Sequence, residues 1–556
     1  MFNRSGGQPR DLHPLCARWV FGSLALFAGM AVLHMWPLAA APATWSRHDN
    51  GDAILNEWII GWIAHQLPRH PLHLFDATIF YPEPNTLAFS EHMFVQALMG
   101  APLSWAGAPS LLVHNLLVIA GFALTGWTMS LVVYRWTGDR WAAIVAGLLL
   151  AFNAHSLTRM ANLQAMHVEF LPLAVYALDR LLVRPTTAAA AGLGFAIALQ
   201  ALTSNYLLVM MAFAMTAAAL VRSTEWIGRQ RGRTFILLIC AAALASVIVV
   251  PFLLPYVRAQ REQGLTRTLQ AVNVYSGSWG DYLTTGGRLH FNAWSAPFWT
   301  EMKAALFPGV TAMLLAAVAV VTRVAWRDRA LRLWLAAGAA GLLMSFGTKM
   351  PGYVLLYRIV PLLQGTRAPV RFGYLALTAV AALGGFGLAW LNRSAWMSHG
   401  RRRVALGLLA SALVTVEAAR LPIGYVPGYR VPEIYRTLAA ERPHAVVELP
   451  LPPPAVFGQN APYMLNSMLG WWPLVNGYSG FLPESYLKRR VDLALFPADE
   501  AIAVLRNLGI DYAAIHKEEF SHRFPDALER LAAARALRPV ASAGDIAIYH
   551  VEASGR

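Results

Sequence analysis

Four side chains that can donate or accept a proton lie in one segment near the start of the chain. Asp49 and Asp52 are three residues apart, and Glu91 and His92 follow as neighbours further along. Long apolar stretches flank the segment, so these groups stand beside a membrane if those stretches span it. Charged side chains held beside a bilayer are unfavourable and often functional. A carboxylate in such a place suits a general base, which takes a proton from a hydroxyl group.

The stretch after Asp52 predicts a helix that positions this carboxylate. In AILNEWIIGWIAHQL (53–67) apolar residues recur at helical spacing, which predicts one apolar face with tryptophans suited to a membrane interface. Asp52 then lies near the helix N-terminus, where a carboxylate also accepts hydrogen bonds from unpaired N–H groups. The capping role and the chemical role both stay open for Asp52, and Glu57 is interpreted as a solvated helix position.

Two arginines four residues apart form a candidate phosphate site. Arg367 and Arg371 lie in GTRAPVRFG (365–373), with Lys349 nearby. A planar guanidinium can bind two phosphate oxygens at once. The alternative is that both arginines anchor the next apolar stretch at the level of the lipid headgroups. Second choices for phosphate binding are the arginines of the segment 258–302, namely Arg258, Arg261, Arg267 and Arg288.

His167 is a further candidate, in NLQAMHVEFLPL (162–173), with Asn162 and Glu169 in the same stretch. A histidine at the end of an apolar stretch more often packs with its hydrogen bonds satisfied than binds a ligand. His167 joins the candidate substrate-binding residues if its end of the span adjoins Asp52.

The composition is that of an integral membrane protein. Of the 556 residues, 57% are hydrophobic and 13% are charged, and the mean hydropathy is +0.45, whereas soluble domains carry about 25% charged residues. The net charge of +15 is spread mostly over short loops between apolar stretches. A nucleic-acid-binding protein would gather that charge on one soluble surface, so nucleic acid is excluded as a partner. The two cysteines, Cys16 and Cys240, predict no disulfide framework.

Apolar stretches of about 20 residues predict an α-helical polytopic membrane protein with about eleven spans. These lie near 19–41, 109–134, 141–156, 163–182, 187–203, 205–222, 234–257, 303–322, 331–347, 372–391 and 404–420. The stretch 350–363 is too short to span comfortably and predicts a re-entrant or interfacial helix. The first span is interpreted as a retained anchor, because its apolar run of about 20 residues exceeds the 7 to 15 of a signal peptide.

The arginines predict which loops are cytoplasmic, because basic residues in short loops resist export. With the N-terminus inside, every second loop is basic. The first loop, the segments 258–302 and 348–371, and everything after about residue 420 are then outside. The basic residues assigned to the cytoplasmic side are Arg135, Arg140, Arg180, Arg184, Arg222, Arg229, Arg231, Arg233, Arg323, Arg327, Arg329, Arg332, Arg393, Arg401, Arg402 and Arg403.

The chain changes character at about residue 420, where prolines and mixed polarity replace long apolar stretches. We expect a cytoplasmic tail at 1–18, a membrane domain at 19–420 with its first exterior loop at 42–108, and a small exterior α/β domain at 421–556. Strands are predicted near 444–451, 511–516 and 545–551, and helices near 498–509 and 525–537.

Several motifs together carry a family resemblance. They are a Gly-Asp pair followed by tryptophans (51–62), LFDATIFYPEPNTLAFSEH (74–92), NLQAMH (162–167), TRAPVRFG (366–373) and NGYSGFLPESY (476–486). With an acidic first exterior loop on a multi-span scaffold, the chain resembles the GT-C superfamily of polyprenyl-phosphate-sugar-dependent glycosyltransferases. More narrowly, it resembles a group of bacterial membrane proteins within or near that superfamily.

The resemblance implies a GT-C-like membrane domain and a multi-pass location in the bacterial inner (cytoplasmic) membrane. It implies that Asp52, or Asp49 in its place, is the general base. The donor is then a polyprenyl-phosphate sugar, either hexosyl or pentosyl, and the acceptor is a glycan, a lipid or a protein. Glu91, His92, His167, Arg367 and Arg371 are expected to bind substrate.

Two other functions stay open. A non-catalytic membrane protein that binds or translocates a lipid-linked glycan explains the same arginines and aromatic loops without chemistry at Asp52. A secondary transporter predicts acids in the middle of the spans, where Glu417 is the main example. No cofactor is indicated with certainty. Asp49, Asp52, Glu91 and His92 have ligand types that suit a divalent metal, but their spacing is no recognised metal signature.

Overall fold

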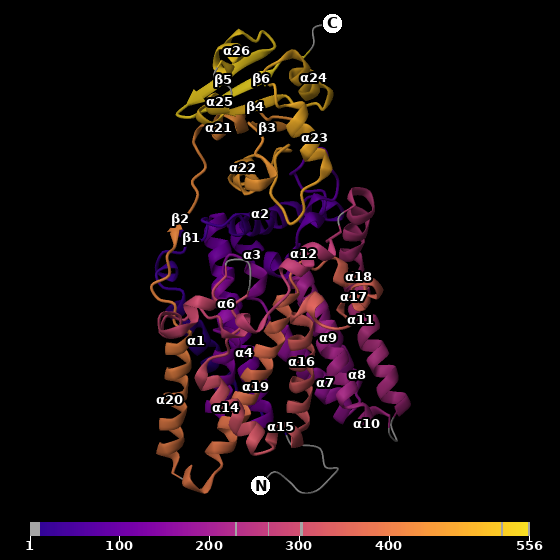
Figure 1. Ribbon diagram of the computed structural model, residues 1–556, viewed down its shortest axis with the longest axis vertical. Helices are drawn as coiled ribbons and strands as arrows, with labels where there is room; N and C mark the ends of the chain where they lie inside the picture. Colours follow the sequence, from indigo (N-terminus) through magenta and orange to yellow (C-terminus); the bar gives the residue numbers. More distant parts are fainter. Residues whose placement is uncertain are drawn as a thin grey trace. The chain divides into compact units, whose positions relative to one another are not determined.

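The computed structural model describes residues 12–227, 231–264, 266–300, 304–397, 399–523 and 526–553 of the chain (Figure 1). The predicted cytoplasmic tail therefore lies mostly outside the described residues, as does Arg229. The chain divides into two units. One, here called the helical unit, comprises the residues up to 41, 115–251 and 266–424, and the other, the loop–sheet unit, comprises 42–114, 252–265 and the residues from 425 onward.

Helices supply the regular structure of the helical unit, and two of them continue into residues of the other unit. They are α1 (Ala17–His34), α4 (Ser110–Thr137), α5 (Arg140–Ala151), α6 (Ala154–Thr158), α7 (Phe170–Val183), α8 (Thr187–Thr203), α9 (Asn205–Val221), α10 (Ser223–Trp226), α11 (Arg231–Gln263), α12 (Leu269–Val274), α13 (Arg288–His290), α14 (Val310–Val321), α15 (Val324–Arg327), α16 (Arg329–Ser345), α17 (Tyr353–Ile359), α18 (Pro361–Gln364), α19 (Gly373–Asn392) and α20 (Gly400–Ala418).

Each of the eleven predicted spans overlaps at least one of these helices. Within the described residues, five helices are long and apolar enough to cross a membrane, and three shorter ones are also apolar. The five are Ala17–His34, Ser110–Thr137, Arg140–Thr158, Gly232–Gln263 and Pro369–Asn392. A helical, multi-pass protein is thus supported, while the number of spans and their direction stay predictions. The predicted short helix at 350–363 is found as α17 and α18, which meet at Pro361.

Helix α19 forms the centre of the helical unit and is buried on nearly every side. It packs against α5, α14 and α16. Glycines permit this approach, because a Cβ atom on Gly385 would lie 2.8 Å from the Cβ of Ala146, and one on Gly387 would lie 2.0 Å from the carbonyl oxygen of Leu315. Larger residues there would force the helix backbones apart.

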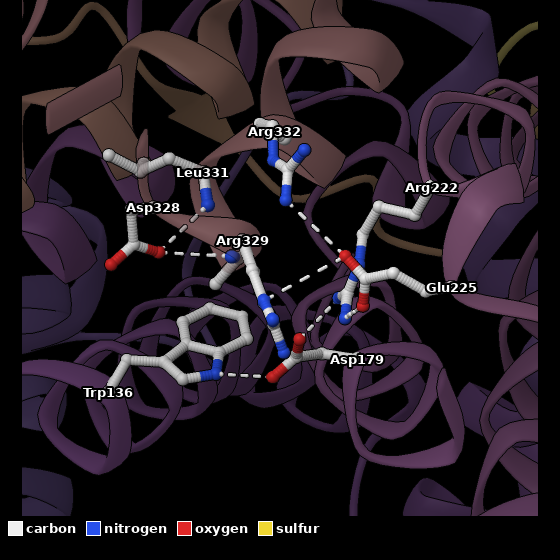
Figure 2. Close-up of polar contacts among 9 residues, drawn as sticks. Trp136, Asp179, Arg222, Glu225, Asp328, Arg329, Leu331 and Arg332 are labelled. Carbon is white, nitrogen blue, oxygen red and sulfur yellow. Dashed lines mark hydrogen bonds and ion pairs between the residues drawn. The ribbon is translucent and has the colours of Figure 1, made fainter. Parts of the chain in front are cut away.

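Charged side chains join several helices of this unit in what we call the paired-arginine network (Figure 2). Arg222 is fully buried and donates to Asp179 of α7 and to Glu225 of α10. Asp179 also accepts from Trp136 Nε1 at 3.0 Å, and Arg332 of α16 donates to Glu225 at 3.3 Å. Two arginines that the sequence analysis uses as topology markers are therefore also structural ion-pair partners.

The loop–sheet unit combines the first loop with the C-terminal part of the chain. Its helices are α2 (Gly51–Gln66), α3 (Phe94–Trp105), α21 (Ile434–Ala440), α22 (Ala461–Ser467), α23 (Glu484–Asp492), α24 (Asp499–Asn507), α25 (Lys517–Arg523) and α26 (Ala527–Ala533). Its strands are β1 (Trp45–Ser46), β2 (Val426–Pro427), β3 (Val446–Leu449), β4 (Tyr512–His516), β5 (Leu537–Ala543) and β6 (Ile546–Val551).

The sheet of this unit, yellow and orange in Figure 1, has the order β3-β4-β6-β5. Strands β3 and β4 are parallel, and the other neighbours are antiparallel. The three predicted strands and two predicted helices are present. Strand β5 was not predicted, because it contains Pro539 at an irregular register and leaves much of its length exposed.

First-loop residues pair directly with residues near the other end of the chain. Strand β1 pairs antiparallel with β2, and the N–H groups of Phe80 and Tyr81 donate to the carbonyl oxygens of Asn476 and Leu474. These backbone bonds hold the loop and the C-terminal segment in one unit.

The prediction for α2 is confirmed as a helix but wrong about its faces. Residues on all sides of α2 are buried, including Trp58 and Trp62, which are 0% and 2% exposed. This helix is therefore a core element, whereas the sequence pattern indicates a helix with a single apolar face at a membrane interface.

Candidate functional site

Asp52 lies in the first turn of α2, as predicted. The cap of this helix is Asn50, whose side-chain oxygen accepts from the Asp52 N–H at 2.9 Å. Asn50 therefore caps this helix. The carboxylate of Asp52 is partly exposed, and its Oδ1 accepts a hydrogen bond from the Tyr478 hydroxyl at 2.8 Å. A partly exposed carboxylate at a helix N-terminus is stabilised by the helix dipole and can accept a proton.

Asp49 is held differently from Asp52. Both of its carboxylate oxygens accept from Arg47, at 2.9 Å each, and its side chain is 39% exposed. These hydrogen bonds to Arg47 hold the pKa of Asp49 below its ordinary value. A carboxylate paired in this way is a weaker proton acceptor than one that is not.

Glu57 is buried, so its interpretation as a solvated position is wrong. It is 3% exposed and accepts from Ser110 Oγ at 2.5 Å and from His48 Nε2 at 2.8 Å. The other ring nitrogen of His48 accepts from the Tyr429 N–H at 2.9 Å, which places the ring proton on Nε2. This chain of bonds fixes the loop just before Asp52 to the start of α4 and to the segment after β2.

Glu91 is partly exposed, whereas its neighbour His92 is 1% exposed. The Tyr256 hydroxyl donates to the carbonyl oxygen of Ser90, so His92 Nδ1 donates to that hydroxyl, at 3.0 Å. The ring of His92 stacks on Phe252 with centroids 5.5 Å apart. Burial lowers the pKa of His92 to about 4. His92 is thus an uncharged packing residue at neutral pH in this structure.

His167 lies in the helical unit with both ring nitrogens partnered. Nδ1 is 2.9 Å from Glu169 Oε1, and Nε2 donates to the carbonyl oxygen of Leu117 at 3.0 Å. The ring is fully buried, and Gly121 of α4 leaves the space it occupies, since a Cβ there would lie 2.9 Å from His167 Cδ2. This is the satisfied packing arrangement that the sequence analysis gives as the ordinary alternative.

Arg367 and Arg371 lie over tyrosine rings, also in the helical unit. The Arg367 guanidinium is 4.7 Å from the ring centroid of Tyr275, and that of Arg371 is 4.6 Å from the ring centroid of Tyr206. The Tyr206 hydroxyl also accepts from the Arg367 N–H at 2.9 Å. Among the described residues, neither arginine forms an ion pair with a carboxylate.

Arg267, a second choice in the sequence, adds a third positive charge to this group, which we call the open-arginine cluster. Burial, and then the charge of Arg367, lower the pKa of Arg267. Like charges held together favour binding of an anion. The ammonium group of Lys349 donates to the carbonyl oxygen of Gly277 at 2.9 Å, two residues after Tyr275.

Glu417 has a structural role that the transporter hypothesis does not require. It accepts from the N–H and the hydroxyl of Thr311, at 3.0 and 2.5 Å, and so caps the N-terminus of α14. His290 Nε2 lies 3.3 Å from its other oxygen.

Tyr478, Tyr206 and Tyr275 were missed because their partners lie far away in sequence. The Asp52–Tyr478 bond joins residues 426 positions apart. The only signal for Tyr478 is the motif NGYSGFLPESY, which the sequence could not connect to Asp52. In the described part of the chain, no three His, Cys, Asp or Glu side chains are grouped so that they could hold a metal ion.

Comparison with known proteins identifies the fold. No family model and no curated protein matches the chain. Arabinofuranosyltransferase AftD from Mycobacteria has a similar structure, with a TM-score of 0.58 and 18% identity over 98% of this chain and 42% of AftD. Archaeal oligosaccharyltransferase AglB from Archaeoglobus fulgidus, in a complex with an inhibitory peptide and a dolichol-phosphate, gives 0.53 and 14% over 90% of this chain and 70% of AglB. Both are GT-C glycosyltransferases, so the chain has the GT-C fold, as its sequence motifs imply.

Proposed function

We propose that this protein is a glycosyltransferase that moves a sugar from a polyprenyl-phosphate donor to a glycan, lipid or protein acceptor. Asp52 is its general base, and the reaction takes place on the exterior face of the bacterial inner membrane. The observation that carries the proposal is the carboxylate of Asp52, held partly exposed in the first turn of α2 in a chain with the GT-C fold.

The chemistry needs one base and one site for the leaving phosphate. Asp52 takes the proton of the acceptor hydroxyl as its oxygen attacks the anomeric carbon of the donor sugar. The bond between that carbon and the phosphate oxygen breaks, and the lipid phosphate leaves with the electron pair. The sugar is transferred with inversion, and the donor's own phosphate bond supplies the driving force.

The base is assigned to Asp52 and not to Asp49, because Arg47 occupies both carboxylate oxygens of Asp49. The open-arginine cluster supplies the phosphate site. Arg367 and Arg371 have no carboxylate partner among the described residues. A guanidinium held over an aromatic ring can still bind an anion through the N–H groups in its plane. Glu91 is a substrate-binding candidate at the loop surface, whereas the burial of His92 and His167 favours an indirect role for these two residues.

The test uses the full-length protein, purified in detergent or nanodiscs, with a panel of labelled hexosyl and pentosyl polyprenyl phosphates. A transferase releases free polyprenyl phosphate and labels an acceptor. Asp52→Asn should lower turnover by about 10²- to 10⁴-fold, the usual contribution of a general base, and leave donor binding intact. Undiminished turnover in this variant excludes Asp52 as the base.

The second candidate function is a non-catalytic protein that binds or translocates a lipid-linked glycan, and the open-arginine cluster favours it as much as the transferase. In that case the wild-type protein binds the donors and releases no polyprenyl phosphate from any of them. Asp52→Asn then changes neither binding nor transport.

A further inference from the structure

Two motifs that lie far apart in the sequence meet at the proposed base. The Gly51–Asp52 pair begins α2, and Tyr478 belongs to NGYSGFLPESY (476–486), in the C-terminal part of the loop–sheet unit. The Tyr478 hydroxyl donates to Asp52 Oδ1 at 2.8 Å. This contact connects the carboxylate to a part of the chain that the proposed chemistry does not otherwise use.

Gly51 provides the space for the tyrosine ring. A Cβ atom at this position would lie 3.1 Å from Cε1 and 3.2 Å from Cζ of Tyr478, tighter than ordinary van der Waals contact. The ring also lies against Phe457, with centroids 5.0 Å apart. A glycine before Asp52 therefore lets the Tyr478 ring lie close to the helix N-terminus, and this accounts for the Gly-Asp pair in the motif.

Asn476 fixes the segment that carries Tyr478. Its buried side chain accepts from the N–H of Glu448 at 2.8 Å, donates to the carbonyl oxygen of Glu448 at 3.0 Å, and donates to Asn460 Oδ1 at 2.9 Å. Glu448 belongs to β3. The Asn476 side chain thus forms the two hydrogen bonds with the backbone of β3 that a neighbouring strand would form. The sheet thereby fixes the position of Tyr478.

We propose that Tyr478 is the positioning residue of Asp52. The orientation of the general base then depends on a residue of the C-terminal segment. This inference rests on the proposed function. The bond to Oδ1 fixes the rotation of the carboxylate and thereby the direction in which Oδ2 points. Removing a side chain that orients a reacting group lowers kcat, because that group is then less well aligned in the transition state. The affinity for the substrate does not change.

The experiment measures kcat, KM, donor binding and the unfolding temperature of the full-length Tyr478→Phe variant. The change removes one hydroxyl and keeps the ring that packs against Gly51 and Phe457. Losing a hydrogen bond to a charged group predicts a fall in kcat of about 10- to 100-fold, with KM, donor binding and unfolding temperature unchanged.

Tyr512→Phe is the matched control. The Tyr512 hydroxyl donates to Glu441 Oε2 at 3.0 Å, so this variant removes the same kind of tyrosine–carboxylate bond from the same unit, away from Asp52. It should keep wild-type kcat. An equal fall in kcat for both variants, or a Tyr478→Phe variant within about twofold of wild type, overturns the inference.

Gly51→Ala tests the geometry independently. Displacing the ring by a few tenths of an ångström should lower kcat, and combining Gly51→Ala with Tyr478→Phe should cost little more than Tyr478→Phe alone, since both act through one bond. Fully additive losses contradict the proposal. A wild-type protein that is inactive with every donor overturns both the proposed function and this inference, whereas an active wild type with an equally active Tyr478→Phe variant overturns this inference alone.

Discussion

Arg222 and Arg371 both lie in the helical unit, and their surroundings differ in kind. Arg222 is fully buried between the carboxylates of Asp179 and Glu225. Arg371 lies over the ring of Tyr206 and forms no ion pair with a carboxylate of the described residues. The first arginine has all its charge balanced by the protein. The second has no carboxylate of the described residues to balance its charge and can bind an anion from outside the protein, which is what separates a structural ion pair from a candidate binding site.

The largest expected effect concerns the paired-arginine network. Arg222→Ala removes the charged partner of the buried carboxylate of Asp179, which keeps only the hydrogen bond from Trp136, and should lower the free energy of unfolding by about 3 to 5 kcal/mol. Denaturant or thermal unfolding in detergent measures this. Arg329→Ala is the control, because Arg329 lies 3.9 Å from Glu225 and is 42% exposed, so its loss should be small. Equal stability of the two variants would show that burial does not increase the contribution of the Arg222 ion pairs to the free energy of unfolding.

Replacing the arginines of the open-arginine cluster should weaken phosphate binding and leave the stability of the protein unchanged. Arg371→Ala and Arg367→Ala should each weaken the binding of a polyprenyl phosphate by about 10- to 100-fold, the loss of a charge-assisted contact. Unfolding should change little, because no carboxylate of the described residues loses a partner. A drop in unfolding temperature with unchanged phosphate affinity would instead support the alternative that these arginines anchor a span at the lipid headgroups.

The aromatic support of the cluster should matter less. Tyr275→Leu removes the ring under Arg367 and should weaken phosphate binding by about two- to fivefold, which corresponds to a cation–π contact of 0.5 to 1 kcal/mol. Tyr275→Phe keeps the ring face and should bind as the wild type does. Titration of the three proteins with polyprenyl phosphate separates them, and a Phe variant as weak as the Leu variant would assign the effect to the hydroxyl.

The smallest effect is expected at the exposed pair of Arg47 and Asp49. Asp49→Asn should change the free energy of unfolding by less than about 1 kcal/mol, as is usual for exposed pairs. Because Arg47 lowers the pKa of Asp49, the pair stabilises the protein above about pH 4 and loses this contribution as the pH falls through the lowered pKa. Wild type and variant should therefore converge in unfolding temperature on acidification. A gap that widens would contradict this sign.

Much of the fold and part of the site could be predicted from local patterns. Apolar stretches located the long helices, and the position of Asp52 at a helix start followed from the spacing of the residues after it. The closeness of Arg367 and Arg371 in the sequence indicates a phosphate site, and that site stays a prediction. These features depend on neighbours along the chain.

The missed features depend on partners brought close only by folding. Glu57 was interpreted as solvated because its helix shows one apolar face, but His48 and Ser110 approach it from separate segments. Tyr206 lies 161 positions from Arg367. Sequence periodicity describes which face of a helix is apolar, and it cannot describe what covers the other faces.

The pairing of Trp45–Ser46 with Val426–Pro427 has a consequence for the order of synthesis. A ribosome makes the first loop early, but the strand that pairs with it, the Tyr429 N–H that binds His48 and the tyrosine that binds Asp52 are all made more than 370 residues later. A growing chain cannot form these contacts. The first loop therefore cannot complete its folding until most of the protein has been synthesised. A protein truncated before residue 425 would carry every residue of α2 and still lack the partners that order its start.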